Sequence, residues 1–139
     1  MRSIFLIVTC MAFATATTRI KMIEIAVNVR LHCQNPYGKW AHVFLMEDDF
    51  ADNAIDEDDT LDFHGYHFDS DKKLRLYGED FEWTGIEPYL HVSHSCVKKL
   101  GAWDSIRVDL MSGMYRSRIF DVDIDLDTGN VTVTSQRMH

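Results

Sequence analysis

The feature of this sequence that most constrains its fold is a strict two-residue alternation of apolar and polar side chains. In residues 23–33 every second position holds an aliphatic residue or cysteine, and polar side chains fill most of the positions between them. An extended strand places such a series on one face, whereas a helix would scatter it around its circumference. The segment therefore predicts a half-buried β-strand that ends with Cys33 on its buried face.

Further alternating segments follow, separated by clusters of turn-forming residues. Strands are expected at residues 40–47, 61–64, 66–68, 73–77, 89–94, 104–110, 118–127 and 131–134, with a turn at Gly78. Both faces of the segment at 40–47 are rather apolar, which suits a central strand or one covered by a partner. Short strands with regularly spaced turn signals are typical of a sandwich or barrel. We predict one all-β domain, a sandwich of about seven or eight strands.

The N-terminus has the pattern of a secretory signal peptide. A short basic region at residues 1–3 precedes an apolar run at 4–13, and Ala14-Thr15-Ala16 supplies the small-x-small cleavage pattern. The apolar run is too short for a stable membrane anchor. We expect a signal peptide at residues 1–16 and a mature, secreted domain at 17–139, the alternative being a buried first helix or strand.

Two cysteines would remain after cleavage. Cys10 leaves with the signal peptide, whereas Cys33 and Cys96 stay in the mature chain. An even pair in an oxidising compartment predicts a disulfide, with two free thiols as the alternative. The bridge would close a loop of 96 − 33 = 63 positions. A loop of that size stabilises a fold by roughly 4 kcal/mol in the chain-entropy model.

The charge of the chain limits its partners. The formal net charge is −8, which argues against a nucleic-acid partner because phosphate binding needs a basic surface. Nine carboxylates gather at residues 47–62, and such a run favours a solvated loop. A calcium site is the alternative, because dense carboxylates suit a hard cation, although the spacing is not that of an EF-hand.

No residue is assigned to catalysis, to a metal or to a cofactor. His94 and Cys96 share one face of a predicted strand, and with His64 or His91 they resemble part of a zinc site. A cysteine in a disulfide cannot be a thiolate ligand, so we favour a packed, hydrogen-bonded His94. The sequence also has neither a Gly-x-Ser-x-Gly motif nor a glycine-rich phosphate loop. The protein is therefore predicted not to be an enzyme.

One modification site is predicted near the C-terminus. Asn130-Val131-Thr132 is an N-glycosylation sequon at an expected hairpin turn. In a secreted chain, Asn130 is therefore expected to carry a glycan.

From about residue 24 to residue 126 the chain resembles the nematode transthyretin-like family. The resemblance is carried by Leu31-x-Cys33, Pro36, Val43-Phe44-Leu45-x-Glu47-Asp48, Leu76-Tyr77-Gly78, Glu82, Ile86-x-Pro88-Tyr89-Leu90 and His94-x-Cys96. Two segments depart from the family pattern. The chain has Lys72-Lys73-Leu74 where Gly-x-Phe is usual, and Asp121-Val122-Asp123 where Asp-Leu-Gly is frequent. A further cysteine that many members have after His-x-Cys is absent.

The resemblance implies a transthyretin/immunoglobulin-like β-sandwich that acts as a secreted, non-catalytic binding or signalling module. No cofactor is expected. A transmembrane anchor is not expected either, because the sequence has no second long apolar run. The expected partner is an extracellular or cell-surface protein or a lipid. We expect it to meet the acidic loop or exposed aromatic side chains, of which the candidates are Trp40, Phe50, Trp83 and Trp103.

Two alternatives come from other functional classes. By analogy with transthyretin, the chain could carry a small hydrophobic ligand in a channel between the subunits of a homo-oligomer. It could also be related to the 5-hydroxyisourate hydrolases, because Tyr115-Arg116-Ser117 resembles part of their Tyr-Arg-Gly-Ser ending. The fold alone does not decide which of these functions is correct.

Overall fold

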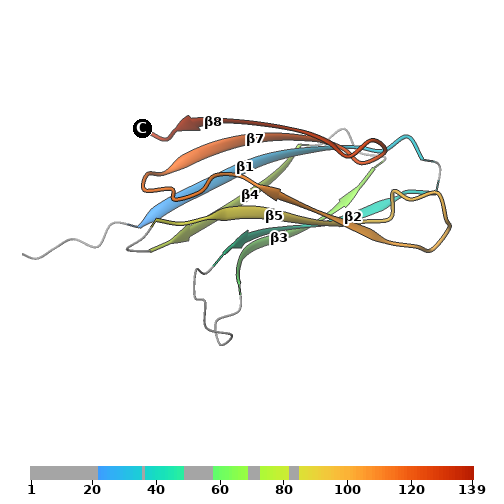
Figure 1. Cartoon of the computed structure of the whole chain (residues 1–139), viewed down its shortest axis with the longest axis horizontal. Coiled ribbons are helices and arrows are strands. Elements are labelled where there is room, and N and C mark those ends of the chain that lie inside the picture. Colours follow the sequence, from blue (N-terminus) through green and yellow to red (C-terminus); the bar gives the residue numbers. More distant parts are fainter. Residues whose placement is uncertain (1–21, 36, 49–57, 69–72, 82–84) are drawn as a thin grey trace, which may run out of the picture.

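A computed structural model describes residues 22–35, 37–48, 58–68, 73–81 and 85–139 (Figure 1). Eight strands and no helix are found in these residues. The strands are β1 (Ile23–His32), β2 (Trp40–Glu47), β3 (Asp59–His67), β4 (Leu74–Asp80), β5 (Pro88–His94), β6 (Asp104–Asp109), β7 (Arg118–Asp125) and β8 (Asn130–Arg137). The prediction of an all-β chain with seven or eight strands is confirmed.

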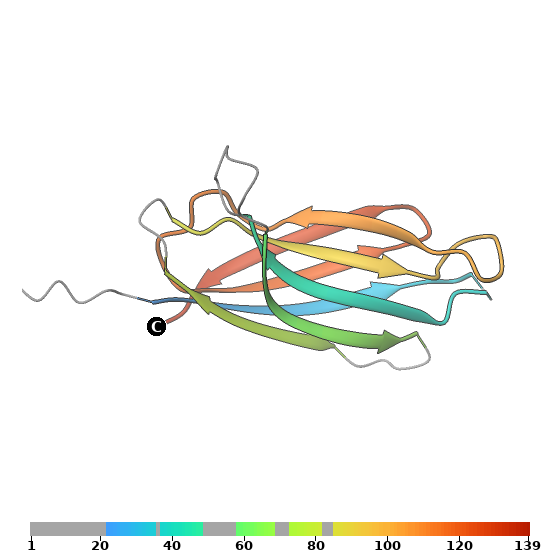
Figure 2. The same cartoon turned by 90° about the horizontal axis from the view of Figure 1, so that it is seen from below.

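The strands form two four-stranded sheets that lie one over the other. The first sheet has the order β4-β1-β7-β8, and the second has the order β3-β2-β5-β6. All neighbours are antiparallel except β1 and β7, which run parallel. Figure 1 shows the two layers from the side, and Figure 2 shows the second sheet nearer the viewer. This is the β-sandwich that the alternating segments predict.

The core lies between the sheets and consists of the apolar members of each alternating segment. Val27 of β1 and Phe120 of β7 face it from the first sheet, and Leu45 and Leu90 face it from the second, all fully buried. Burial of alternate residues on paired strands requires the observed register, because a slip by one residue would turn each of these side chains to the opposite face. Pro88 begins β5, as its missing N–H requires.

The turn predicted at Gly78 is wrong. The backbone stays extended through this residue to Asp80, and Gly78 pairs with Ile25. A Cβ at Gly78 would lie 2.7 Å from the Cβ of Leu61, so the glycine allows β3 to pack closely against β4 rather than reversing the chain. The two segments expected around Gly65 are likewise one strand, with an irregularity in pairing between Leu45 and Met46.

Several predictions concern residues outside the described part. These are the signal peptide at residues 1–16, most of the acidic loop, and the exposed aromatic candidates Phe50 and Trp83. The boundary between the signal peptide and the mature domain therefore stays a prediction, as does calcium binding. Among the described residues, the structure contains no helix that is long and apolar enough to cross a membrane.

Candidate functional site

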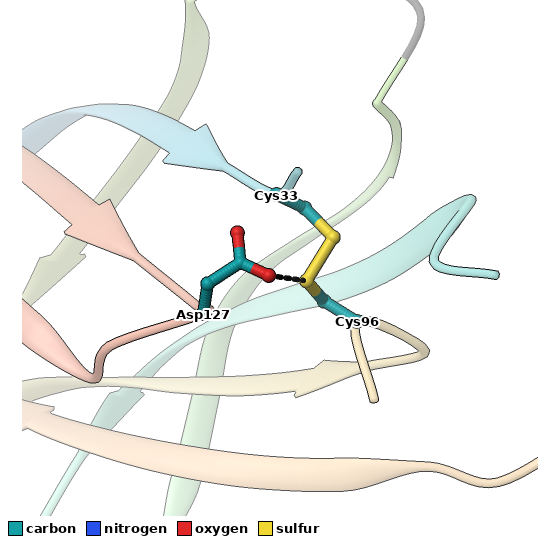
Figure 3. Close-up of side chains that lie close together, drawn as sticks. All are labelled: Cys33, Cys96 and Asp127. Carbon is teal, nitrogen blue, oxygen red and sulfur yellow. Dashed lines mark hydrogen bonds between the residues drawn. A yellow bond between two sulfur atoms is a disulfide. The ribbon is translucent and has the colours of Figure 1, made fainter. Parts of the chain in front are cut away.

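Cys33 and Cys96 form a disulfide that joins the two sheets at one end of the sandwich. Cys33 follows β1 and Cys96 follows β5, and their Cα atoms lie 6.0 Å apart. Cys96 is almost fully buried, as expected from its place after the alternating β5. The bridge predicted from the cysteine count is therefore present, and it ties the first sheet to the second (Figure 3).

Asp127 lies against this disulfide, yet the three residues do not form a metal site. One carboxylate oxygen of Asp127 is 3.6 Å from the sulfur of Cys96 (Figure 3). The other carboxylate oxygen accepts the backbone N–H of Gln34 at 2.5 Å. The two sulfurs and the carboxylate lie close enough together to hold an ion. Both sulfurs are bonded to each other, however, so neither is the thiolate that zinc requires, and the Cys96 sulfur has no proton to donate to Asp127.

His94 is a buried side chain at the end of β5. It is 5% exposed, and its Nδ1 atom has no hydrogen-bond partner in the described part of the chain. The sequence predicts a packed histidine with a hydrogen-bonded ring; the packing is observed, but this nitrogen is not paired. His91 lies on the opposite face of the strand, and His64 lies on β3 near the carboxylate of Asp62. The structure therefore does not bring the candidate zinc histidines together.

Burial of His94 predicts a loss of stability in mild acid. Desolvation lowers its pKa below the ordinary value of 6.5, and nearby Asp104 opposes this shift only in part. The unfolded chain therefore takes up a proton at a higher pH than the folded chain. The neutral, buried His94 therefore contributes to the free energy of unfolding. Its contribution is fully present above about pH 6.5 and is lost as the pH falls from there toward the pKa of His94 in the folded state.

The measurement is urea unfolding of the wild type and of His94→Phe between pH 7.5 and pH 5. We expect the variant to lack part of the wild-type decrease in unfolding free energy over this range. Variant His64→Ala, which removes an exposed histidine, serves as the control and should keep the wild-type decrease. Equal slopes for the wild type and His94→Phe would contradict the prediction.

The outward surface of the second sheet is covered by aromatic rings and histidines. We call this surface the aromatic face. It consists of Trp40, His42 and Phe44 of β2, Phe63 and His67 of β3, Tyr89 and His91 of β5, and Trp103 just before β6. Antiparallel sheets with one solvated side usually carry polar residues there. Trp40, Phe63 and Trp103 are each about half exposed, so the second sheet departs from that rule.

The rings of the aromatic face contact one another across the strands. The His42 ring centroid lies 5.2 Å from that of Trp103 and 5.8 Å from that of Phe63, and Phe63 in turn lies 4.7 Å from Phe44. A second contact joins Trp40 to the edge of the His67 ring at 4.4 Å. These separations are those of interacting aromatic pairs. The rings therefore hold one another in place in two groups, one around Trp40 and the other around His42 and Phe44, and both groups lie along the outward side of β2.

A polar cluster closes the aromatic face at the end far from the disulfide. The Arg107 guanidinium lies 3.7 Å above the Tyr89 ring and forms ion pairs with Asp48 at 2.6 Å and Asp109 at 2.8 Å. Burial and a hydrogen bond from its hydroxyl to Asp58 raise the pKa of Tyr89 to about 12. At neutral pH the phenol stays protonated and the guanidinium is neutralised by carboxylates. This cluster is thus suited to holding Tyr89 in place rather than to proton transfer.

The outward surface of the first sheet has the opposite character. Asp121 accepts a hydrogen bond from the Asn28 amide at 3.1 Å, and Asp123 pairs with His32 at 2.8 Å and with Arg30 at 3.8 Å. Asn28, Arg30 and the two aspartates line an open hollow of about 370 Å³. Its charged walls suit a small hydrophobic ligand poorly, because apolar pockets are what such ligands require.

The segment that resembles part of the hydrolase ending lies at the end of the sandwich opposite the disulfide. Tyr115 is exposed in the connection between β6 and β7, and the Ser117 hydroxyl accepts the backbone N–H of Glu24 at 3.0 Å. Arg116 lines an open hollow there together with His139. The histidines of the aromatic face, in contrast, lie on the outward surface of the second sheet. The structure thus separates this segment from most of the histidines in the described chain.

Asn130 is the first residue of β8 and is exposed. Glycosylation of Asn130 is a prediction that a measurement of the protein's mass can test. Protein secreted from animal cells should lose mass after treatment with a peptide-N-glycosidase, and Asn130→Gln should have the smaller mass without treatment. An untreated mass equal to that of the bare mature chain would contradict occupancy.

Only part of the aromatic face is evident from the sequence. The alternation in residues 40–47 places Trp40, His42 and Phe44 on one strand face, and Trp40 and Trp103 are candidates for exposed side chains that meet a partner, but Phe63 is not connected to them. The available signal is the apolar character of both faces of residues 40–47. It cannot show that the ring of Phe63, from another strand, extends the same surface.

Comparison with known proteins agrees with this architecture. Residues 28–110 match the family model described as the Transthyretin-like family. The chain is 31% identical over 100 residues to Transthyretin-like protein 1 of Caenorhabditis elegans, covering 70% of this chain and 64% of that protein. It is 38% identical over 73 residues to Transthyretin-like protein 2 of the same animal, covering 51% and 48%. The alignments thus span about half to two thirds of these relatives. No solved structure matches.

Proposed function

The chain belongs to the transthyretin-like family, and from this premise we propose that it is a secreted, non-catalytic binding module that meets its extracellular partner through the aromatic face. The observation that carries the proposal is the gathering of contacting aromatic rings on the outward surface of the second sheet. Aromatic residues are enriched in protein interfaces and dominate their binding energy. Half-exposed tryptophans held by neighbouring rings are thus suited to contact a partner.

Two features support an extracellular location. The N-terminal residues have the pattern of a signal peptide, and the disulfide between Cys33 and Cys96 is a bond that persists in oxidising compartments. The direct test is expression of the full chain in animal cells. We expect the protein in the medium with Thr17, or a residue within two or three positions of it, at its N-terminus. Retention inside the cells with Met1 intact would contradict secretion.

The binding role is tested with fluorescently labelled mature protein added to cells and extracellular material of the source animal. We expect saturable binding that falls at least tenfold in the Trp40→Ala/Trp103→Ala variant, because truncating central aromatic contacts commonly costs about 2 kcal/mol or more. Tyr77→Ala is the matched control, since Tyr77 is equally exposed on the first sheet. Binding that does not saturate, or that is unchanged in the tryptophan variant, would contradict the proposal.

The non-catalytic part of the proposal has its own assay. Purified protein incubated with 5-hydroxyisourate should show no turnover above the uncatalysed background. Turnover that Arg116→Ala abolishes would instead support the hydrolase alternative.

A further inference from the structure

We infer that the aromatic face of one molecule packs against the aromatic face of a second copy, so that the binding module is a two-fold symmetric dimer. This inference rests on the proposed function, because it names a partner for the same surface. It follows from the composition, the charge and the shape of that surface.

The composition of the second sheet is that of the centre of a protein interface. Besides the rings of the aromatic face, its outward positions hold Met46, Arg107 and small polar residues. Tryptophan, tyrosine, phenylalanine, methionine and arginine are enriched in interfaces, whereas lysine and glutamate are depleted. No lysine or glutamate occupies an outward position of the second sheet within the described strands. A surface of this composition gains free energy when another protein covers it.

The charge distribution favours a second copy as the covering protein. Each molecule has a formal net charge of −8, so most ways of bringing two copies together place carboxylates against carboxylates. The outward surface of the first sheet would do so through Asp121 and Asp123. At the outward surface of the second sheet, Asp48 and Asp109 pair with Arg107 and Asp58 accepts the Tyr89 hydroxyl, all at one end of the aromatic face. Two copies can therefore approach through the remainder of the face with little like-charge repulsion when the two-fold arrangement keeps these two ends apart.

A partner of a different sequence can also be selected by charges that complement this acidic chain. Complementary charges steer partners together and set specificity. A two-fold symmetric interface instead requires a surface that is complementary to itself. Outside the polar cluster around Arg107, the aromatic face is a surface of aromatic rings and polar histidines, such as His42 and His91, and this surface meets that requirement.

The shape of the surface fits face-to-face packing of sheets. The second sheet lies on the outside of the sandwich, with no described strand over it (Figure 2). Two sheets pack about 10 Å apart with interdigitating side chains. A sheet of four strands that are about 4.8 Å apart and about seven residues long can bury roughly 600 Å² of surface per copy, once the side chains at the rim are included. The total of ~1,200 Å² is at the lower end of specific interfaces.

An interface of that size predicts a reversible dimer with a dissociation constant on the order of 1–100 µM. The test is sedimentation of the mature, disulfide-bonded protein over concentrations on both sides of this range. We expect the mass to rise from that of one chain to that of two and to stop there. Phe63→Glu, which places a like charge on both faces, should weaken dimerisation at least tenfold.

Tyr77→Glu provides the matched control on the first sheet and should leave the dissociation constant unchanged. Both substituted side chains are about half exposed, and circular dichroism should show that both variants keep the fold. A monomer at every concentration would overturn the inference, as would a dimer that Phe63→Glu leaves intact. A mass that rises without stopping at two chains would also overturn it, since a two-fold interface is closed.

The two proposals fail in different ways. If the protein is monomeric but the tryptophan variant loses its saturable extracellular binding, the dimer is wrong and the proposed function stands. If Phe63→Glu dissociates the dimer but the labelled protein shows no saturable binding, the dimer stands and the proposed function is wrong.

Discussion

Removal of the disulfide by the double substitution Cys33→Ala/Cys96→Ala is expected to lower the free energy of unfolding by roughly 4 kcal/mol. The two cysteines are 63 residues apart, and without the bond the unfolded chain regains the freedom of that whole loop. Single domains are stable by only about 5–15 kcal/mol. The variant should therefore unfold at a much lower denaturant concentration than the wild type.

Urea unfolding followed by tryptophan fluorescence measures this difference. Both cysteines are replaced together, so that no buried single thiol remains to form bonds between molecules. A reductant serves as the control. It should bring the wild type close to the stability of the variant and leave the variant itself unchanged. Equal midpoints for the oxidised wild type and the variant would show that the bond does not constrain the unfolded state as proposed.

The strands could be predicted because their pattern is local. The alternation from Ile23 to Cys33 assigns one face to the core whichever strands lie beside it. The structure pairs β1 with β4 on one side and with β7 on the other. No local pattern indicates those neighbours, since pairing joins residues far apart in the chain. The disulfide was predictable for a different reason, because only one pair of cysteines remains once Cys10 is assigned to the predicted signal peptide.

Gly78 shows where local reasoning fails. Glycine is frequent in turns because it tolerates positive φ, but it also occurs where another chain segment approaches closely. At Gly78 the second reason applies, because Leu61 occupies the space that a side chain would need. The sequence does not distinguish the two cases, since the neighbour belongs to a different strand.

The aromatic face was only partly predictable for the same reason. Trp40 and Trp103 stand out individually as large aromatic residues. These tryptophans share one surface with Phe63 because the strands have the order β3-β2-β5-β6 and because the register sets Phe63 opposite Phe44. A surface composed of several strands exists only once their pairing is known.

The substitution Gly38→Ala is expected to destabilise the protein by roughly 1–3 kcal/mol, the usual range for overpacking a filled site. A Cβ at residue 38 would lie 2.6 Å from the sulfur of Cys33 and 2.7 Å from the Cα of Cys96. The backbone has little room to move away. The Gly38 N–H donates to the carbonyl of Asn35, and the next N–H, that of Lys39, donates to the Ser95 hydroxyl, both at 3.0 Å.

The sign of this effect is what makes the experiment informative. Replacing glycine by alanine at an unstrained site stabilises a protein by about 0.4–1 kcal/mol, because the unfolded chain loses freedom. Gly38 is not among the glycines with positive φ, so steric contact alone should reverse the sign. Gly65→Ala is the matched control. No atom lies within 4 Å of a Cβ at that position, and the variant should be unchanged or slightly more stable.

A double-mutant cycle with the disulfide then identifies the source of the strain. Without the cysteines, the sulfur that the new methyl group at position 38 would strike is absent. Residue 96 is also no longer tied to β1, so its backbone can yield. The destabilisation caused by Gly38→Ala should therefore shrink by at least about 0.5 kcal/mol in the Cys33→Ala/Cys96→Ala background, as expected for groups in contact. An equal loss in both backgrounds would mean that the clash is with the backbone alone and that Gly38 is independent of the bridge.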